Sequence, residues 1–88
     1  MNPRYQIVLF PPAERFLRKL SGDIRQRIVA KIRALAESPL PPGFAKLEAY
    51  NAYRVRVGDY RIIYTFNRGR LVVLVLDVGH RKDIYRRL

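Results

Sequence analysis

The sequence has no cysteine, no tryptophan and few acidic residues. Without cysteine, disulfides, thiol catalysis and a cysteine-ligated zinc site are excluded. The apolar runs Ile7–Phe10 and Leu71–Leu76 are too short to span a membrane. Because Pro11-Pro12 interrupts the first run, the start of the chain also lacks the apolar segment of a signal peptide. These absences predict a cytoplasmic protein with no membrane partner.

Most of the charged residues in the sequence are basic. The 88 residues include 18 Lys+Arg against 7 Asp+Glu, a formal net charge of +11. This excess implies an anionic partner, and because most of it is arginine, which binds phosphate bidentately and stacks on bases, RNA or DNA is favoured over lipid. The length and a hydrophobic content of 49% predict one globular domain over residues 1–88.

The stretch Tyr53–Tyr64 organises the rest of the chain. It reads Y-R-V-R-V-G-D-Y-R-I-I-Y, two alternating runs around Gly58-Asp59, and predicts a tight β-hairpin. In this register Arg56 faces Arg61, and Arg54 lies diagonally on the same face. Like charges opposite one another destabilise a sheet, and no carboxylate falls in the register. We therefore interpret the three arginines as a site for a polyanion rather than a solvated face.

Two helices are predicted in the first half of the chain. Pro11-Pro12 suits the first turn of a helix, and the apolar spacing from Ala13 to Leu20 supports one. Ser21 or Asp23 can cap a second helix, in which apolar residues repeat from Ile24 to Leu35. A short break between two helices predicts a helix hairpin.

The strands complete an α+β prediction. Residues 4–10 read as one strand, 53–66 as the hairpin, and the continuous apolar run 71–76 as a central strand covered on both faces. Residues 39–52 read as a loop. The expected fold is a largely antiparallel sheet of about four strands, in the order β-α-α-β-β-β. The helix hairpin packs on one face, and a short helix or a tail follows residue 80.

A second candidate cluster lies at Val78–Tyr85, which reads V-G-H-R-K-D-I-Y. If the last strand pairs with the strand of Arg61, its end lies near the hairpin turn. That arrangement brings His80, Arg81 and Tyr85 to the end of the sheet that carries the arginines. Histidine exchanges protons readily near neutral pH, and a tyrosine among positive charges releases its proton more easily.

The hairpin followed by V-G-H-R-x-x-x-Y resembles RelE toxins of the RelE/ParE superfamily, over essentially the whole chain and most specifically over Tyr53–Tyr85. The resemblance implies a prokaryotic endoribonuclease that cleaves mRNA in the ribosomal A site and inhibits translation. It also implies a cognate RelB-like antitoxin, expected to be acidic. The family's functional positions fall on Arg54, Arg56, Arg61, Arg81 and Tyr85.

The implied reaction is metal-independent cleavage by the RNA 2′-OH, with no cofactor. It requires a base, an acid and charge stabilisation at the phosphorane. Arg61 and Arg81 suit the last role, and Arg54 and Arg56 would bind the backbone. Well-studied relatives often carry lysine at the latter two positions. Since arginine keeps its proton, no proton transfer is expected there.

The acid–base role stays open between Tyr85 and His80, with Glu48 a weaker candidate. Asp77 and Asp83 lack a third ligand, so no metal site is predicted. Two other functions remain as alternatives: a ParE-like, non-catalytic inhibitor of DNA gyrase, and a basic module that only binds an acidic antitoxin. The ParE branch generally lacks the complete set of catalytic residues. The presence of this set in the sequence favours the ribonuclease.

Overall fold

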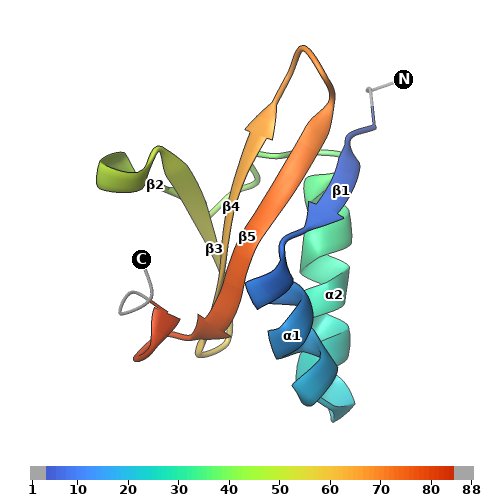
Figure 1. The fold of residues 1–88 in the computed structure, drawn as a ribbon, viewed down its shortest axis with the longest axis vertical. Coiled ribbons are helices and arrows are strands. Elements are labelled where there is room, and N and C mark those ends of the chain that lie inside the picture. The colour runs from blue at the N-terminus through green and yellow to red at the C-terminus, as the bar shows by residue number, and fades with distance from the viewer. Residues whose placement is uncertain (1–3, 85–88) are drawn as a thin grey trace.

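A computed structural model describes residues 4–84, which form a sheet and a helix hairpin that covers one face of it (Figure 1). The elements in chain order are β1 (Gln6–Leu9), α1 (Pro11–Lys19), α2 (Gly22–Leu35), β2 (Ala45–Leu47), the 3-10 turn η1 (Glu48–Tyr50), β3 (Ala52–Val57), β4 (Tyr60–Asn67) and β5 (Val72–His80). The strand order is β1-β5-β4-β3-β2. The predicted α+β class and helix hairpin are confirmed.

The sheet differs from the prediction at one edge. It has five strands rather than about four, because Ala45–Leu47, within the segment predicted to be a loop, pairs with β3 as a short edge strand. At the other edge β1 pairs with β5 in parallel, and the remaining pairings are antiparallel, so the prediction of a largely antiparallel sheet is confirmed. β2 could not be recognised in the sequence, because three residues are too few to show alternation of apolar and polar side chains, and prolines and a glycine precede them.

The last strand is internal but not central, because β4 occupies the middle of the sheet. Its side chains also alternate in burial: Val73 and Val75 are fully buried, whereas Leu74 and Leu76 are half-buried. The prediction that this run is covered on both faces is therefore only partly confirmed. The helices cover one face, and the other is only partly covered.

Local signals explain where the helices begin. Pro11 and Pro12 occupy the first turn of α1, where a missing N–H costs no hydrogen bond. Arg18 Nη2 donates to Glu14 Oε1 at 2.8 Å across one turn of the same helix. Ser21 occupies the N-cap position of α2, although its side chain makes no capping hydrogen bond, and Asp23 lies in the first turn.

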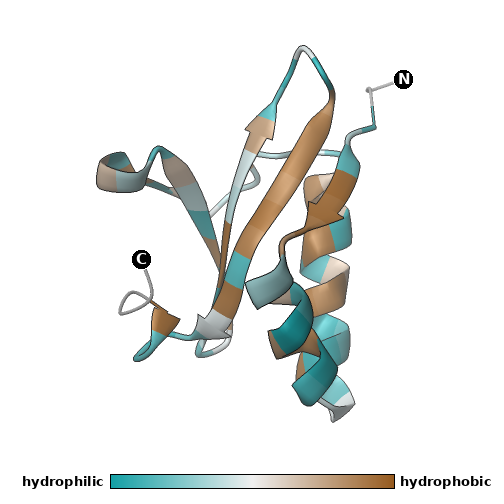
Figure 2. Ribbon diagram, in the orientation of Figure 1, coloured by the Kyte–Doolittle hydropathy of each residue, from teal (hydrophilic) through white to brown (hydrophobic). Residues whose placement is uncertain are grey.

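The main core lies between the helix hairpin and the sheet. Apolar residues of α1 and α2 pack on inward-facing residues of β3, β4 and β5, and the fully buried members of the cluster include Ala13, Ile28, Leu35, Ile62, Tyr64, Val73, Val75 and Val78. In Figure 2 the hydrophobic colour follows β5 and parts of both helices, while other helical positions are hydrophilic. The opposite face of the sheet is left available for function.

Tyr64 ties the connection between α2 and β2 to the core. Its side chain is fully buried, and its hydroxyl donates a hydrogen bond to the carbonyl oxygen of Pro39. Burial, with a smaller contribution from the neighbouring Tyr53, raises the pKa of Tyr64 well above its usual value. The neutral phenol thus holds the segment that leads into β2.

We expect Tyr64→Phe to lower the free energy of unfolding by about 1 kcal/mol near neutral pH, because the Pro39 carbonyl loses its donor. Thermal melts should show a midpoint about 4–8 °C lower. Tyr50→Phe, at an exposed position, is the matched control. Since the pKa of Tyr64 is raised in the folded state, the wild-type advantage is complete below about pH 10 and declines as pH rises further. Equal midpoints at neutral pH would contradict this role.

Candidate functional site

The hairpin β3–β4 has the predicted register. Val57 pairs with Tyr60 and Arg56 pairs with Arg61 across the turn. Gly58 has a φ of 59°, as a type II′ turn requires of its first central residue. The turn therefore determines which side chains lie opposite one another, and it places two arginines directly across the strands.

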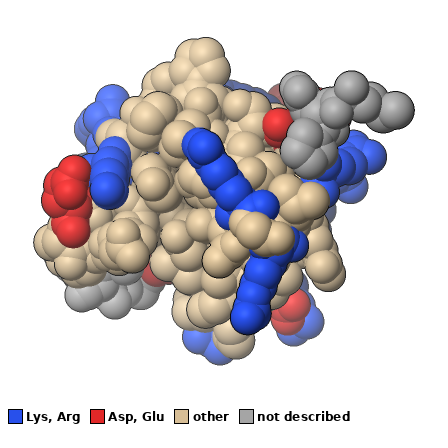
Figure 3. All heavy atoms as spheres, turned by 90° about the horizontal axis from the view of Figure 1, so that it is seen from above, with Lys and Arg blue, Asp and Glu red and all other residues tan. Residues whose placement is uncertain are grey.

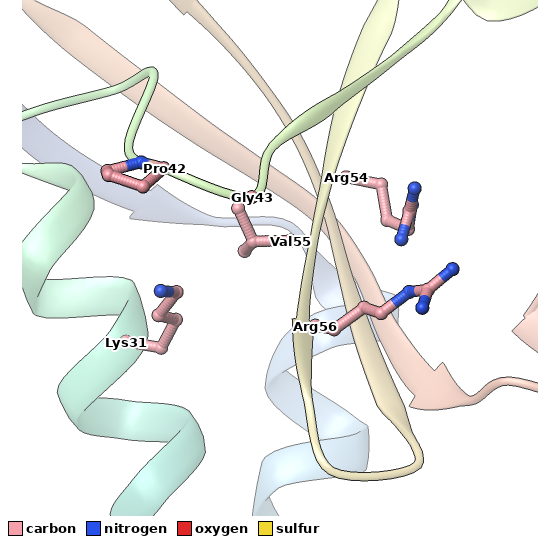
Figure 4. Close-up of a pocket in the computed structure, with 6 residues that line it drawn as sticks. All are labelled: Lys31, Pro42, Gly43, Arg54, Val55 and Arg56. Atoms are coloured by element: carbon pink, nitrogen blue, oxygen red, sulfur yellow. The ribbon is translucent and has the colours of Figure 1, made fainter.

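The arginine side chains lie on the face of the sheet that the helices leave open. Figure 4 shows Arg54 and Arg56 extending from β3 on the side away from α2. Arg61 shares their face because directly paired residues point the same way. Arg56 is exposed, and Arg54 and Arg61 are half-buried. We call Arg54, Arg56 and Arg61 the arginine face.

The end of β5 completes this arrangement. Arg61 pairs with Gly79, and the backbone N–H of Arg81 donates to the carbonyl oxygen of Asp59 at 2.8 Å. Arg81 is therefore attached to the hairpin turn, and its side chain is exposed. The predicted convergence of the last strand on the hairpin turn is confirmed for this residue.

His80 lies on the opposite face. It pairs with Tyr60, whose ring packs against Phe16 of α1 on the helix side of the sheet. The rings of His80 and Tyr60 also meet edge to face, with centroids 5.5 Å apart. Nδ1 of His80 accepts a hydrogen bond from the backbone N–H of Lys82 at 3.2 Å. The structure thus does not bring this imidazole together with the hairpin arginines.

Tyr85 and the possible final helix lie outside the described residues. The chain leading to them turns across the open face, where Ile84 is fully buried against Ala52 and Ile63, with Leu76 packed beside them. This small second core covers part of the open face next to the arginines. Glu48, the weaker candidate base, lies in η1 and is exposed, with its carboxylate 4.0 Å from Lys46 Nζ.

Asp77 is the residue whose position the sequence did not indicate. A bulge shifts the pairing so that Tyr64 faces Val75 while Ile63 faces Asp77, leaving Leu76 as the extra residue on β5. Asp77 therefore shares the face of Ile63 and Arg54, and it is only 5% exposed. Its Oδ1 accepts the backbone N–H of Val78 at 2.8 Å. A carboxylate does lie among the arginines, on the strand beside the hairpin.

The wider surface is basic. On the face that Figure 3 shows, lysine and arginine side chains lie at several separate places, and acidic side chains are fewer. Within residues 4–84, no three histidine, cysteine or carboxylate side chains gather to hold a metal ion. No helix in that part of the chain is long and apolar enough to cross a membrane. The part of the open face that lies on the hairpin thus carries arginine side chains.

This fold is that of a known class of proteins. The sequence model for the family described as the ParE toxin of the type II toxin-antitoxin system parDE matches residues 7–85. Toxin RelG of Mycobacterium tuberculosis is 33% identical over 85 residues, which cover 94% of this chain and 98% of that protein. The protein is therefore a toxin of a type II toxin–antitoxin system. It belongs to the ParE toxin family, within the RelE/ParE superfamily, as the sequence resemblance predicted.

Solved structures agree with this assignment. The toxin–antitoxin complex RelBE2 of Mycobacterium tuberculosis matches with a TM-score of 0.77 at 29% identity, covering 91% of this chain and 94% of that one. The archaeal RelE–RelB complex of Pyrococcus horikoshii OT3 matches with a TM-score of 0.78 at 27% identity, covering 89% and 96%. The likeness extends over the helix hairpin and the sheet together.

Proposed function

We propose that this toxin is a ribosome-dependent endoribonuclease that cleaves mRNA in the ribosomal A site and thereby stops translation. The observation that carries the proposal is the direct pairing of Arg56 with Arg61 on the open face, with Arg54 beside them. This arrangement opposes sheet stability and suits an RNA phosphate. The similarity to RelE toxins supports it.

The proposed chemistry uses the substrate's own hydroxyl. The 2′-oxygen attacks the adjacent phosphorus, the bond to the 5′-oxygen breaks, and the products are a 2′,3′-cyclic phosphate and a 5′-OH. Arg61 and Arg81 stabilise the negative charge that develops on the phosphorane, while Arg54 and Arg56 bind the flanking backbone. Asp77 shares the face of Arg54 and adds one carboxylate beside these arginines.

For proton transfer we propose Tyr85 rather than His80. The ring of His80 packs with Tyr60 on the helix side, and its Nδ1 already accepts a hydrogen bond. Ile84, the residue before Tyr85, packs on the open face beside the hairpin arginines. The resemblance to RelE toxins assigns the functional tyrosine to position 85.

We further propose that a RelB-like antitoxin neutralises this toxin. The similar toxins of Mycobacterium tuberculosis and Pyrococcus horikoshii OT3 were solved as toxin–antitoxin complexes. A net charge of +11 favours an acidic partner segment. Both the antitoxin and RNA are then attracted by the same positive field.

Inhibition of DNA gyrase is the second candidate function, because the matching family is described as the ParE toxin. Mapping transcript 5′ ends after induction of the toxin separates the two. The ribonuclease should give new 5′-OH ends in phase with codons inside translated regions, and none in untranslated RNA. Absence of such ends, together with inhibited supercoiling by purified gyrase, would replace the ribonuclease with the second candidate.

Binding to RNA on the ribosome should weaken steeply with salt. Each phosphate neutralised on a single strand contributes about −0.7 to the slope of log affinity against log salt, so four arginines give about −2.8, or roughly a 50-fold loss for a fourfold rise in salt. The measurement uses ribosomes programmed with 2′-O-methyl mRNA, which cannot be cleaved. Arg56→Gln should reduce the slope by about 0.7, whereas a flat dependence in the wild type would contradict phosphate binding.

A further inference from the structure

A groove runs between α2 and the last residues of β3. It exists because β2 pairs only with Ala52–Arg54, so the rest of β3 is an open edge. Two adjoining hollows of about 450 and 460 Å³ make up the groove, and they share Lys31 and Arg56. None of the described residues that line it is acidic, and its basic lining residues are Arg27 and Lys31 of α2 and Arg54 and Arg56 at the edge of β3.

Two cations of α2 face this groove. Arg27 and Lys31 are four residues apart, on one side of the helix and about 6 Å apart along its axis. Arg27 Nη2 lies 3.9 Å from the position that a Cβ at Gly58 would occupy, so its guanidinium rests against the hairpin turn. Figure 4 shows Lys31 extending toward the space beside Pro42 and Gly43. Within residues 4–84, the ion pairs to carboxylates involve neither cation.

The groove and the arginine face lie on the two sides of one strand edge. In Figure 4, Lys31 is on the helix side of β3, and the guanidinium groups of Arg54 and Arg56 are on the other. Phe44 follows Gly43 directly and is 41% exposed, which gives an aromatic surface on which a base can stack. Cations along a groove with an adjacent aromatic ring favour a single nucleic-acid strand over an isolated anion.

We propose that this groove is a second RNA-binding site, in which Arg27 and Lys31 bind backbone phosphates of RNA that continues around the edge of β3 from the arginine face. The inference rests on the proposed function for the choice of RNA as the partner. The groove contributes affinity, not chemistry, because Arg27 and Lys31 belong to α2 on the helix side of β3, whereas Arg61 lies on the open face.

The test compares two double variants that each remove two positive charges. Arg27→Gln/Lys31→Gln alters the groove, whereas Arg15→Gln/Lys19→Gln alters an exposed pair with the same spacing on α1. Dissociation constants are measured across a salt series with uncleavable 2′-O-methyl RNA, both free and on programmed ribosomes. Relative to the control, the groove variant should bind about tenfold more weakly, with a salt slope smaller by about 1.4.

The readouts separate the possible outcomes. Weaker binding to free RNA supports a strand that continues from the arginine face into the groove. Weaker binding only on ribosomes would assign the groove to ribosomal RNA and overturn the proposal of a continuous strand. The cleavage rate at saturating ribosomes should equal that of the wild type, and Lys31→Arg should retain full affinity with an unchanged melting temperature. Groove and control variants with the same affinity and slope would overturn the inference. Because the binding RNA is uncleavable, failure of the ribonuclease proposal leaves this result interpretable.

Discussion

Arg61→Ala is expected to reduce single-turnover cleavage of mRNA on the ribosome by about 100-fold or more, and Arg81→Ala should have an effect of similar size. Loss of one preorganised group that stabilises developing charge typically costs about 10²–10³ in rate. Arg61 is held on the open face, next to the hairpin turn, by its pairing with Arg56 and Gly79. Both variants should also lose growth inhibition in cells.

The control for these variants is Arg70→Ala, an exposed arginine between β4 and β5. This substitution also removes one positive charge, but at a position outside the arginine face, so it should leave the cleavage rate unchanged. All three variants should fold and still form a complex with the antitoxin, and Arg61→Ala should melt no lower than the wild type because it removes a like-charge pair. If Arg61→Ala and Arg81→Ala stayed fully toxic, catalysis would not be the source of toxicity, and gyrase would become the first target to assay.

Ile28→Ala should destabilise the protein by about 2–5 kcal/mol, the usual range for truncating a buried isoleucine to alanine. Ile28 is fully buried where α2 meets the sheet, in a core that an 88-residue chain cannot readily replace. Since total stability of such domains is about 5–15 kcal/mol, a large share would be lost. Chemical denaturation of purified protein measures the change.

Val29→Ala is the matched control for this substitution, because Val29 is the next residue on the same helix and only half-buried. Its truncation removes less buried surface, so its midpoint should stay close to that of the wild type. If Ile28→Ala lowered the free energy of unfolding no more than Val29→Ala does, the packing of Ile28 between α2 and the sheet would not be a principal source of stability.

The hairpin could be predicted from the sequence because its information is local. A two-residue turn that begins with Gly58 permits one register, and that register determined that Arg56 would face Arg61. The helices could also be predicted from the sequence, since apolar residues at helical spacing indicate both of them and two prolines mark the start of the first. These features depend on neighbouring residues alone.

The last strand was harder to interpret, because its apolar run contains no sign of the bulge. Up to Val75 the side chains alternate as expected, but the extra residue Leu76 reverses which face the following residues occupy. Asp77 consequently joins the arginine face and His80 the helix side, the reverse of an unbroken alternation. Since the bulge depends on packing between distant strands, the candidate site was predicted from the sequence only as far as its arginines.

The pairing of β1 with β5 has a consequence for synthesis of the protein. Gln6 pairs with Val72, so the first strand finds its partner only after most of the chain has been made. Contacts this distant in sequence form late and slowly. The surface proposed to attack translation needs β3, β4 and the end of β5 together. A ribosome therefore completes nearly all of this polypeptide before it has produced anything able to harm it.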